Sequence, residues 1–177
     1  PDYATEAAIY AKHILATVKE PKIAVLMQND DMGRDYFGGF KAGLGAEGQK
    51  HIVQVASYEV TDPTADSQLI ALKNSGANVF FNITTPKFAA QAIRKAAETG
   101  WKPVHYLANV SASLGTVIKP AGYDNGQGVI TARYGIDPTD PTTEHLPEVA
   151  EFKAFMAKYM PSSDLRDLGH ASAYATV

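Results

Sequence analysis

Short apolar runs alternate along the chain with longer segments in which polar and apolar positions mix. Runs of strand length are Ile23–Met27, Ile52–Tyr58, Ala77–Ile83, Val104–Ala108 and Gly128–Tyr134. The first run is apolar throughout, as expected for a strand that is covered on both faces. Each intervening segment is long enough for a crossover helix. The alternation therefore predicts a doubly wound, mainly parallel α/β sheet with helices on both faces.

Apolar positions three or four residues apart predict helices between these strands. Thr85 before Pro86 is typical of an N-cap followed by proline at the first helical position. The segment Asp137–Pro147 places three prolines among polar residues and predicts an exposed loop. The predicted helices are Asp2–Val18, a segment through Tyr36, Phe40 and Leu44, one opened by Asp62-Pro63, one opened by Thr85-Pro86 and ended by Gly100, one through Phe152 and Tyr159, and the start of another at Gly169–Val177.

Glycine is frequent in the helix that follows the first strand. Gly38, Gly39, Gly43 and Gly45 all fall within it. Each interior glycine costs about 1 kcal/mol relative to alanine. The pattern predicts either a helix that lies very close to the sheet or a frayed end after Gly43.

Composition limits the classes of protein to which this sequence can belong. The 177 residues suit one domain or one lobe, and 45% hydrophobic with 20% charged residues is ordinary for a soluble globular chain. A net charge of −3 does not favour binding to nucleic acid or to an anionic membrane. No apolar run approaches the roughly 20 residues that cross a bilayer, so we expect no membrane insertion. The chain starts without methionine, which leaves a trimmed leader open.

The polar turn Asn29–Gly33 does not carry the pattern of a nucleotide loop. The G-x-G-x-x-G sequence is absent, and Gly39-Phe40 stand where a P-loop needs Lys and Ser/Thr. The histidines lack metal-ligand spacing, and there is neither cysteine nor a G-x-S-x-G elbow. We therefore expect no catalytic residue, no metal and no cofactor.

Asp30 and Asp31 after the first strand are similar to the acidic pair that holds Mg²⁺ in phospho-acceptor receiver domains. That chemistry needs an aspartate at the end of the third strand, where this chain has Asn82. We therefore interpret Asp30 and Asp31 as solvated residues whose negative charges stabilise the N-terminus of the following helix.

Three polar turns are expected at the carboxyl edge of the sheet: Asn29–Gly33, Ile83–Pro86 and Asn109–Ser113. Ligands of open parallel sheets bind at this edge. The side chains there suit a small molecule but include no activated nucleophile. They indicate half of a binding cleft, and ordinary helix capping by Thr85 and Ser111 is the alternative.

The sequence resembles the branched-chain amino-acid-binding (Leu/Ile/Val-type) family of ABC-transporter solute receptors, which are type I periplasmic binding proteins. The resemblance covers nearly the whole chain and rests on an ordered series more than on any single motif. The matching stretches are Lys22–Gly45 with N-D-D-M-G-R-D-Y, Asp62–Gln68, S-G-A-N-V-F-F-N at Ser75–Asn82, Phe88–Pro103, K-P-A-G at Lys119–Gly122, and Asp137–Pro141.

The resemblance implies two α/β lobes with a ligand trapped between them, of which residues 1–177 form the second. Residues 1–18 and 165–177 would adjoin crossovers to a missing first lobe. It also implies a non-catalytic, periplasmic receptor that is monomeric when complete. Its partners would be a small-molecule ligand and the membrane permease of an ABC importer, and it would not bind nucleic acid.

The family's ligand contacts in this lobe come from the turns after the first, third and fourth strands. Members that bind amino acids carry a tyrosine and an acidic residue where this chain has Met32 and Val110. A buried ammonium without a carboxylate partner costs several kcal/mol. The resemblance therefore implies an aromatic or branched aliphatic carboxylate more than an α-amino acid, unless Asp31 points inward. The expected contacts are Asp31, Met32, Thr84, Thr85, Asn109, Val110 and Ser111.

Two other classes of protein share this kind of fold. An effector-binding domain of a transcription regulator would need a DNA-binding module upstream. A receiver or flavodoxin-like domain would need a third-strand aspartate or a phosphate loop, and the sequence has neither.

Overall fold

The computed structural model of the chain describes residues 2–175, and a parallel five-stranded sheet forms its centre. The strand order is β2-β1-β3-β4-β5, and every neighbouring pair is parallel. The predicted α/β class is confirmed. The strands are β1 (Ile23–Gln28), β2 (Ile52–Tyr58), β3 (Val79–Ile83), β4 (Val104–Leu107) and β5 (Ile130–Thr131).

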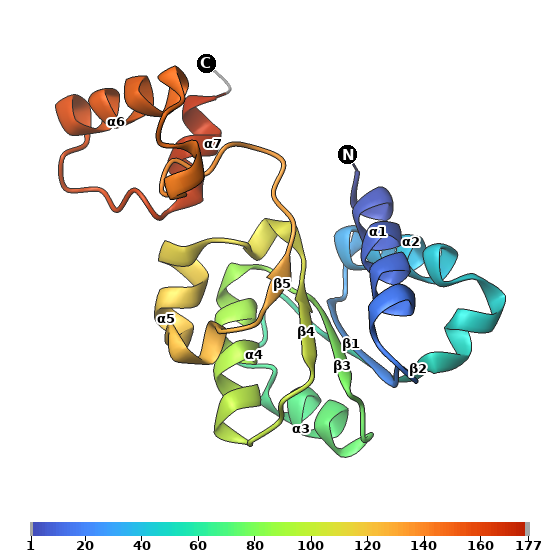
Figure 1. The fold of residues 1–177 in the computed structure, drawn as a ribbon. Coiled ribbons are helices and arrows are strands. Elements are labelled where there is room, and N and C mark those ends of the chain that lie inside the picture. Colours follow the sequence, from blue (N-terminus) through green and yellow to red (C-terminus); the bar gives the residue numbers. More distant parts are fainter. Residues whose placement is uncertain (1, 176–177) are drawn as a thin grey trace.

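Helices cover both faces of this sheet. Helices α1 and α2 lie on one face, and α3, α4 and α5 lie on the other (Figure 1). A short 3-10 turn and a π-helical turn, Asn109–Ser111 and Leu114–Ile118, connect β4 to α5. The helices are α1 (Tyr3–Thr17), α2 (Asp31–Gly48), α3 (Asp66–Asn74), α4 (Pro86–Glu98), α5 (Lys119–Ala121), α6 (Pro147–Tyr159) and α7 (Leu168–Tyr174).

The alternation of side chains along the strands builds two apolar layers. In β3, Val79, Phe81 and Ile83 are buried against α1 and α2. Phe80 points the other way and is buried with residues of α3 and α4. Both faces of the central strand are buried, which explains why all of its residues except Asn82 are apolar.

Two glycines of α2, Gly39 and Gly43, lie against a neighbouring helix and not against the sheet, which corrects the expectation for these two positions. A Cβ on Gly39 would lie 2.3 Å from the Cα of Ala4, and one on Gly43 would lie 2.6 Å from the Cα of Ala8. Both glycines therefore let α2 pack against the backbone of α1. Gly45 has a φ of 67° and breaks the helix, as the alternative of a frayed end anticipated.

Two elements, α3 and β5, differ by several residues from their predicted extents. Helix α3 begins at Asp66, because the carboxylate of Asp62 accepts a hydrogen bond from the Glu59 N–H (2.8 Å) and closes a turn instead of a helix. The fifth strand is much shorter than Gly128–Tyr134. Only Ile130 and Thr131 pair with β4, since β4 itself ends at Leu107.

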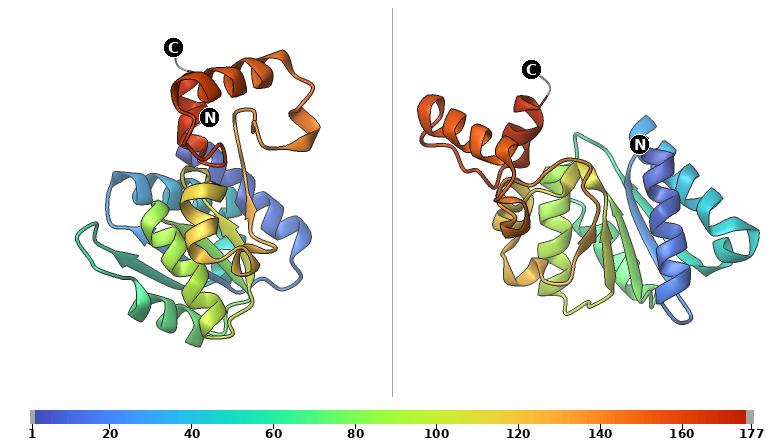
Figure 2. Two further views of the ribbon diagram at one scale, coloured as in Figure 1. Left: turned by 90° about the vertical axis from the view of Figure 1, so that its left-hand side faces the viewer. Right: turned by 45° about the horizontal axis from the view of Figure 1, so that its top comes forward.

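Helices α6 and α7 form a small unit that projects from the sheet (Figure 2). It has a cluster of its own, in which the Phe152 and Tyr174 rings lie 5.4 Å apart. The segment before α7 also touches the body, because the Gly115 N–H donates to the Arg166 carbonyl (2.9 Å). The unit is thus attached through the segment after β5 and through this contact near Arg166.

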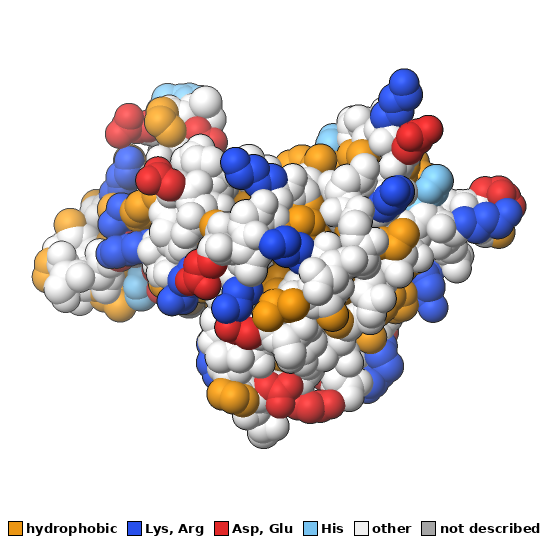
Figure 3. All heavy atoms as spheres, turned by 90° about the horizontal axis from the view of Figure 1, so that it is seen from below, with side chains coloured by type: hydrophobic (Ala, Val, Ile, Leu, Met, Phe, Trp, Pro, Cys, Tyr) orange, Lys and Arg blue, Asp and Glu red, His pale blue; other side chains and the backbone are white. Residues whose placement is uncertain are grey.

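The face seen from below in Figure 3 carries acidic and basic side chains interspersed with one another. This distribution agrees with the small net charge of −3. Among residues 2–175, no helix has both the length and the apolar character to span a bilayer.

Candidate functional site

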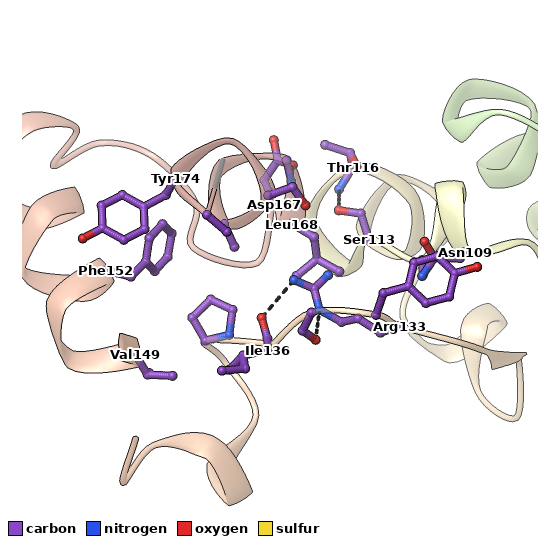
Figure 4. Close-up of a pocket in the computed structure, with 18 of the residues that line it drawn as sticks. Asn109, Ser113, Thr116, Arg133, Ile136, Val149, Phe152, Asp167, Leu168 and Tyr174 are labelled. Carbon is purple, nitrogen blue, oxygen red and sulfur yellow. Dashed lines mark hydrogen bonds between the residues drawn. The ribbon is translucent and has the colours of Figure 1, made fainter. Parts of the chain in front are cut away.

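A cavity of about 720 Å³ lies between the carboxyl end of β4 and the α6–α7 unit. One wall comes from the turn after β4, including Asn109 and Val110, and a second from the segment after β5, including Arg133 and Tyr134. Apolar side chains of α6 and α7 close the third side (Figure 4). The volume of the cavity falls in the range of small-molecule binding sites, about 300–1,000 Å³.

The turn after β4 contributes the two predicted contact residues that line this cavity. The Asn109 N–H donates to a Glu6 carboxylate oxygen (2.8 Å), and its side-chain amide donates to the Ala132 carbonyl (2.5 Å). Val110 is 36% exposed and offers an apolar surface. The 3-10 turn thus holds an amide and an alkyl group at the cavity wall.

Thr84 and Ser111 lie beneath this wall with no exposed surface. The Ser111 hydroxyl donates to the Thr84 carbonyl (2.5 Å), and the Thr84 hydroxyl donates to the Asn82 side-chain oxygen (2.7 Å). The Asn82 amide then donates to Nε2 of His105 (3.1 Å). Burial lowers the pKa of His105 to about 3, so the imidazole is neutral. This chain of bonds fixes the ends of β3 and β4 to each other.

Thr85 belongs to a second polar cluster, between β1, β2 and α4. Its hydroxyl donates to the Gln28 side-chain oxygen (3.1 Å), and its backbone N–H donates to the Tyr58 hydroxyl (3.1 Å). Its position as N-cap of α4 is confirmed, but its side chain makes no capping bond. Thr85 lies outside the set of residues that line the cavity.

The turn after β1 lies outside the cavity lining as well. Asp31 has a side chain that is 97% exposed and pairs with Arg34 (2.8 Å). Met32 is half-buried and packs against the core layer on the α1 side. Asp30 caps α2 by accepting from the Gly33 N–H (2.9 Å), as the solvated-aspartate interpretation anticipated. Contact of Asp31 and Met32 with a ligand stays a prediction.

Sequence reasoning missed the buried acid at this edge. Glu6 in α1 is only 2% exposed, and its carboxylate accepts from the Asn109 N–H and from the hydroxyls of Tyr36 (2.9 Å) and Tyr134. Burial, together with the nearby Glu6 carboxylate, raises the pKa of both tyrosines. One signal was present: Glu6 lies one turn before Tyr10 on the same apolar stripe of α1.

Charge is unevenly distributed around the cavity. Among the described lining residues, Arg133 is the only basic one, and the acidic ones are Glu148, Glu151 and Asp167. The Arg133 guanidinium donates to the carbonyls of Gly135 (3.1 Å) and Ile136 (3.0 Å), as Figure 4 shows. No further hydrogen bond is recorded for its second terminal nitrogen within residues 2–175. An anion at that nitrogen would gain a charge-assisted hydrogen bond.

A comparison with protein-family models identifies the family of the chain. A family model described as periplasmic binding protein matches residues 1–177. A search of curated proteins finds no match.

Solved structures reproduce the fold. A substrate-binding periplasmic protein from Ralstonia solanacearum superimposes with a TM-score of 0.78 at 22% identity, over 93% of this chain and 46% of that one. A branched chain amino acid ABC transporter from Thermus thermophilus, with bound valine, gives 0.77 at 17% identity, over 93% and 41%. A fatty acid ABC transporter substrate-binding protein from Thermomonospora curvata gives 0.73 at 19% identity, over 99% and 45%. The chain spans less than half the length of each.

Proposed function

The chain belongs to the periplasmic binding protein family, and on that premise we propose that it is the ligand-binding second lobe of a solute receptor for an ABC importer. The match of the family model along the entire chain carries this proposal. The fold matches one lobe of a type I periplasmic binding protein. The short span relative to the neighbours supports a partner lobe encoded elsewhere in the same polypeptide. Closure of two lobes over a ligand would produce the shape that a permease recognises.

The proposed ligand is a small carboxylate with an aromatic or branched aliphatic tail. Val110 offers an apolar contact for the tail, and Arg133 is the only described basic residue of the cavity. The turns that hold Asp31, Met32, Thr84, Thr85 and Ser111 remain candidates for contact in the closed form. An α-amino acid is the less favoured alternative.

We further propose that the complete receptor acts in the periplasm as a monomer, with the permease as its membrane partner and without a catalytic step. The family consists of solute-binding receptors, and the neighbours named for ABC transport support this assignment. The receiver alternative is not supported, because this chain has Asn82 where that chemistry needs an aspartate.

Calorimetry tests the two-lobe proposal. We expect the full-length polypeptide to bind aromatic or branched carboxylates, and the 177-residue chain to bind them at least about a hundredfold more weakly, because half of the contacts are missing. Tight binding by the 177-residue chain alone would contradict the proposal. The mass of the intact polypeptide in solution is the matching control: a value near 19.0 kDa would describe an independent lobe, and roughly double would describe a two-lobed receptor.

A further inference from the structure

The Glu6 cluster joins four elements behind one wall of the cavity. Glu6 comes from α1, Tyr36 from α2, Asn109 from the turn after β4, and Tyr134 from the segment after β5. One carboxylate oxygen accepts from the Asn109 N–H (2.8 Å). The other accepts from two hydroxyls, those of Tyr36 (2.9 Å) and Tyr134. The acid is therefore surrounded by donors and faces no cation within residues 2–175.

This geometry fixes the direction of the Tyr134 proton. A tyrosine hydroxyl has a single hydrogen, and a carboxylate can only accept. The hydrogen of Tyr134 therefore points to Glu6, and the lone pairs of its oxygen are left for other donors. Tyr134 lines the cavity and is 51% exposed, so a ligand that reaches its hydroxyl oxygen would meet a hydrogen-bond acceptor.

Asn109 strengthens the acceptor character of the same wall. Its side-chain nitrogen donates to the Ala132 carbonyl (2.5 Å), which fixes the orientation of the amide. No donor within residues 2–175 is recorded for its side-chain oxygen. The wall thus presents two neutral acceptors backed by a buried carboxylate, and a group that donates hydrogen bonds complements it.

We propose that Glu6 is a positioning residue that makes the Tyr134 hydroxyl a hydrogen-bond acceptor, so that the cleft selects carboxylates which also carry a hydroxyl or ammonium donor. This inference rests on the proposed function, because it concerns the ligand of the same cleft.

Four para-substituted benzoates test the inference by calorimetry on the full-length polypeptide. The probes are 4-hydroxybenzoate, 4-(aminomethyl)benzoate, 4-methoxybenzoate and 4-methylbenzoate. We expect the hydroxyl and aminomethyl compounds to bind about tenfold or more tightly than the methoxy compound, because an unpaired buried acceptor is penalised. The first two probes also distinguish a hydroxyl donor from a charged one. Equal affinity for all four would overturn the inference.

The variant Glu6→Gln tests the role of Glu6 itself. The amide oxygen can keep the Asn109 N–H, which leaves the amide nitrogen to donate to both tyrosine oxygens. Tyr134 would then direct its own hydrogen into the cavity. We expect the preference for the hydroxyl over the methoxy compound to fall to near unity. A merely structural role would lower all affinities together and preserve the ratio, and that result would refute the positioning role.

Tyr134→Phe provides an independent measurement if Glu6→Gln does not fold. It removes the acceptor, so the ratio of the affinities for 4-hydroxybenzoate and 4-methoxybenzoate should fall to near unity. The affinity for 4-methylbenzoate should be retained. Tyr123→Phe, an exposed change outside the cavity lining, is the control and should leave the ratio unchanged. A preserved ratio in Tyr134→Phe would contradict the inference. Failure of the wild-type receptor to bind any of these probes or branched carboxylates would instead contradict the proposed ligand class, on which the inference depends.

Discussion

The buried side chain of His105, beneath the cavity wall, makes the stability of the fold depend on pH. Its imidazole is buried in β4, accepts a hydrogen bond from Asn82 and lies 4.6 Å from the Phe80 ring. Burial lowers its pKa to about 3, whereas an unfolded chain would keep the usual value of about 6.5. Between these values only the unfolded state takes up the proton. The stability contribution is therefore complete above about pH 6.5 and is lost as the pH falls toward 3.

We expect the free energy of unfolding to fall by about 2 kcal/mol from pH 6.5 to pH 5 through this residue, since one pKa unit corresponds to about 1.4 kcal/mol. Urea titrations of wild type and His105→Gln at both pH values measure the difference. Glutamine keeps an acceptor for Asn82 but does not titrate, so its pH dependence should be weaker by this amount. His145→Gln, in the exposed loop, is the control and should behave as wild type. Equal pH dependence in His105→Gln and wild type would refute the prediction.

At the scale of single residues, the sequence could place polar side chains at the sheet edge but could not orient them. Thr84 and Ser111 lie at the predicted edge of the sheet, but their hydroxyls point into the protein. There they form the hydrogen bonds that join the ends of β3 and β4. Glu6, in contrast, was not predicted but supports the cavity wall. Its hydrogen-bond partners are distant in sequence, so no local pattern could reveal them.

At the scale of elements, packing of α2 on α1 depends on the missing side chain of Gly39. The Cβ of Gly39→Ala would lie 2.3 Å from the Cα and 2.4 Å from the carbonyl oxygen of Ala4, so the helices must separate. We expect a loss of about 1–3 kcal/mol in unfolding free energy, the usual cost of overpacking. Urea unfolding measures it.

The adjacent Gly38 is a matched control. No atom lies within 4 Å of a Cβ built there, and the residue is exposed. Gly38→Ala should therefore gain up to about 1 kcal/mol from helix propensity alone. If both alanine variants changed stability in the same direction, the contact between α1 and α2 would not be the reason for glycine at 39.

The elements themselves were largely predictable, because β1 to β4 and the amphipathic helices have the appropriate periods. The exceptions have physical causes outside the local pattern. Gly128–Tyr134 has the composition of a strand, but β4 offers no backbone partner beyond Leu107. Asp62 looks like a helix start, but its carboxylate closes the preceding turn.

At the scale of the whole molecule, the α6–α7 unit leaves apolar side chains uncovered. Phe155, Tyr159 and Met160 are exposed on α6 and the segment after it. The proposed first lobe is the partner that would cover them. We expect amide hydrogen exchange in α6 to be at least about tenfold slower in the full-length polypeptide than in the 177-residue chain.

Helix α4 is the internal reference for that measurement, since it is already packed within the body. Its exchange should be the same in both samples. Equal exchange of α6 in both samples would show that the rest of the polypeptide does not cover this unit.

The Glu6 cluster also has a consequence for the order in which the lobe forms during synthesis. The partners of Glu6 lie 30, 103 and 128 positions later in the chain. A nascent chain emerges from its N-terminus, so α1 leaves the ribosome long before Tyr134 exists. Until then the Glu6 side chain must remain hydrated, because burying it earlier would leave its oxygens without these hydrogen-bond donors. The Glu6 cluster is therefore complete only after the segment that follows β5 has been translated.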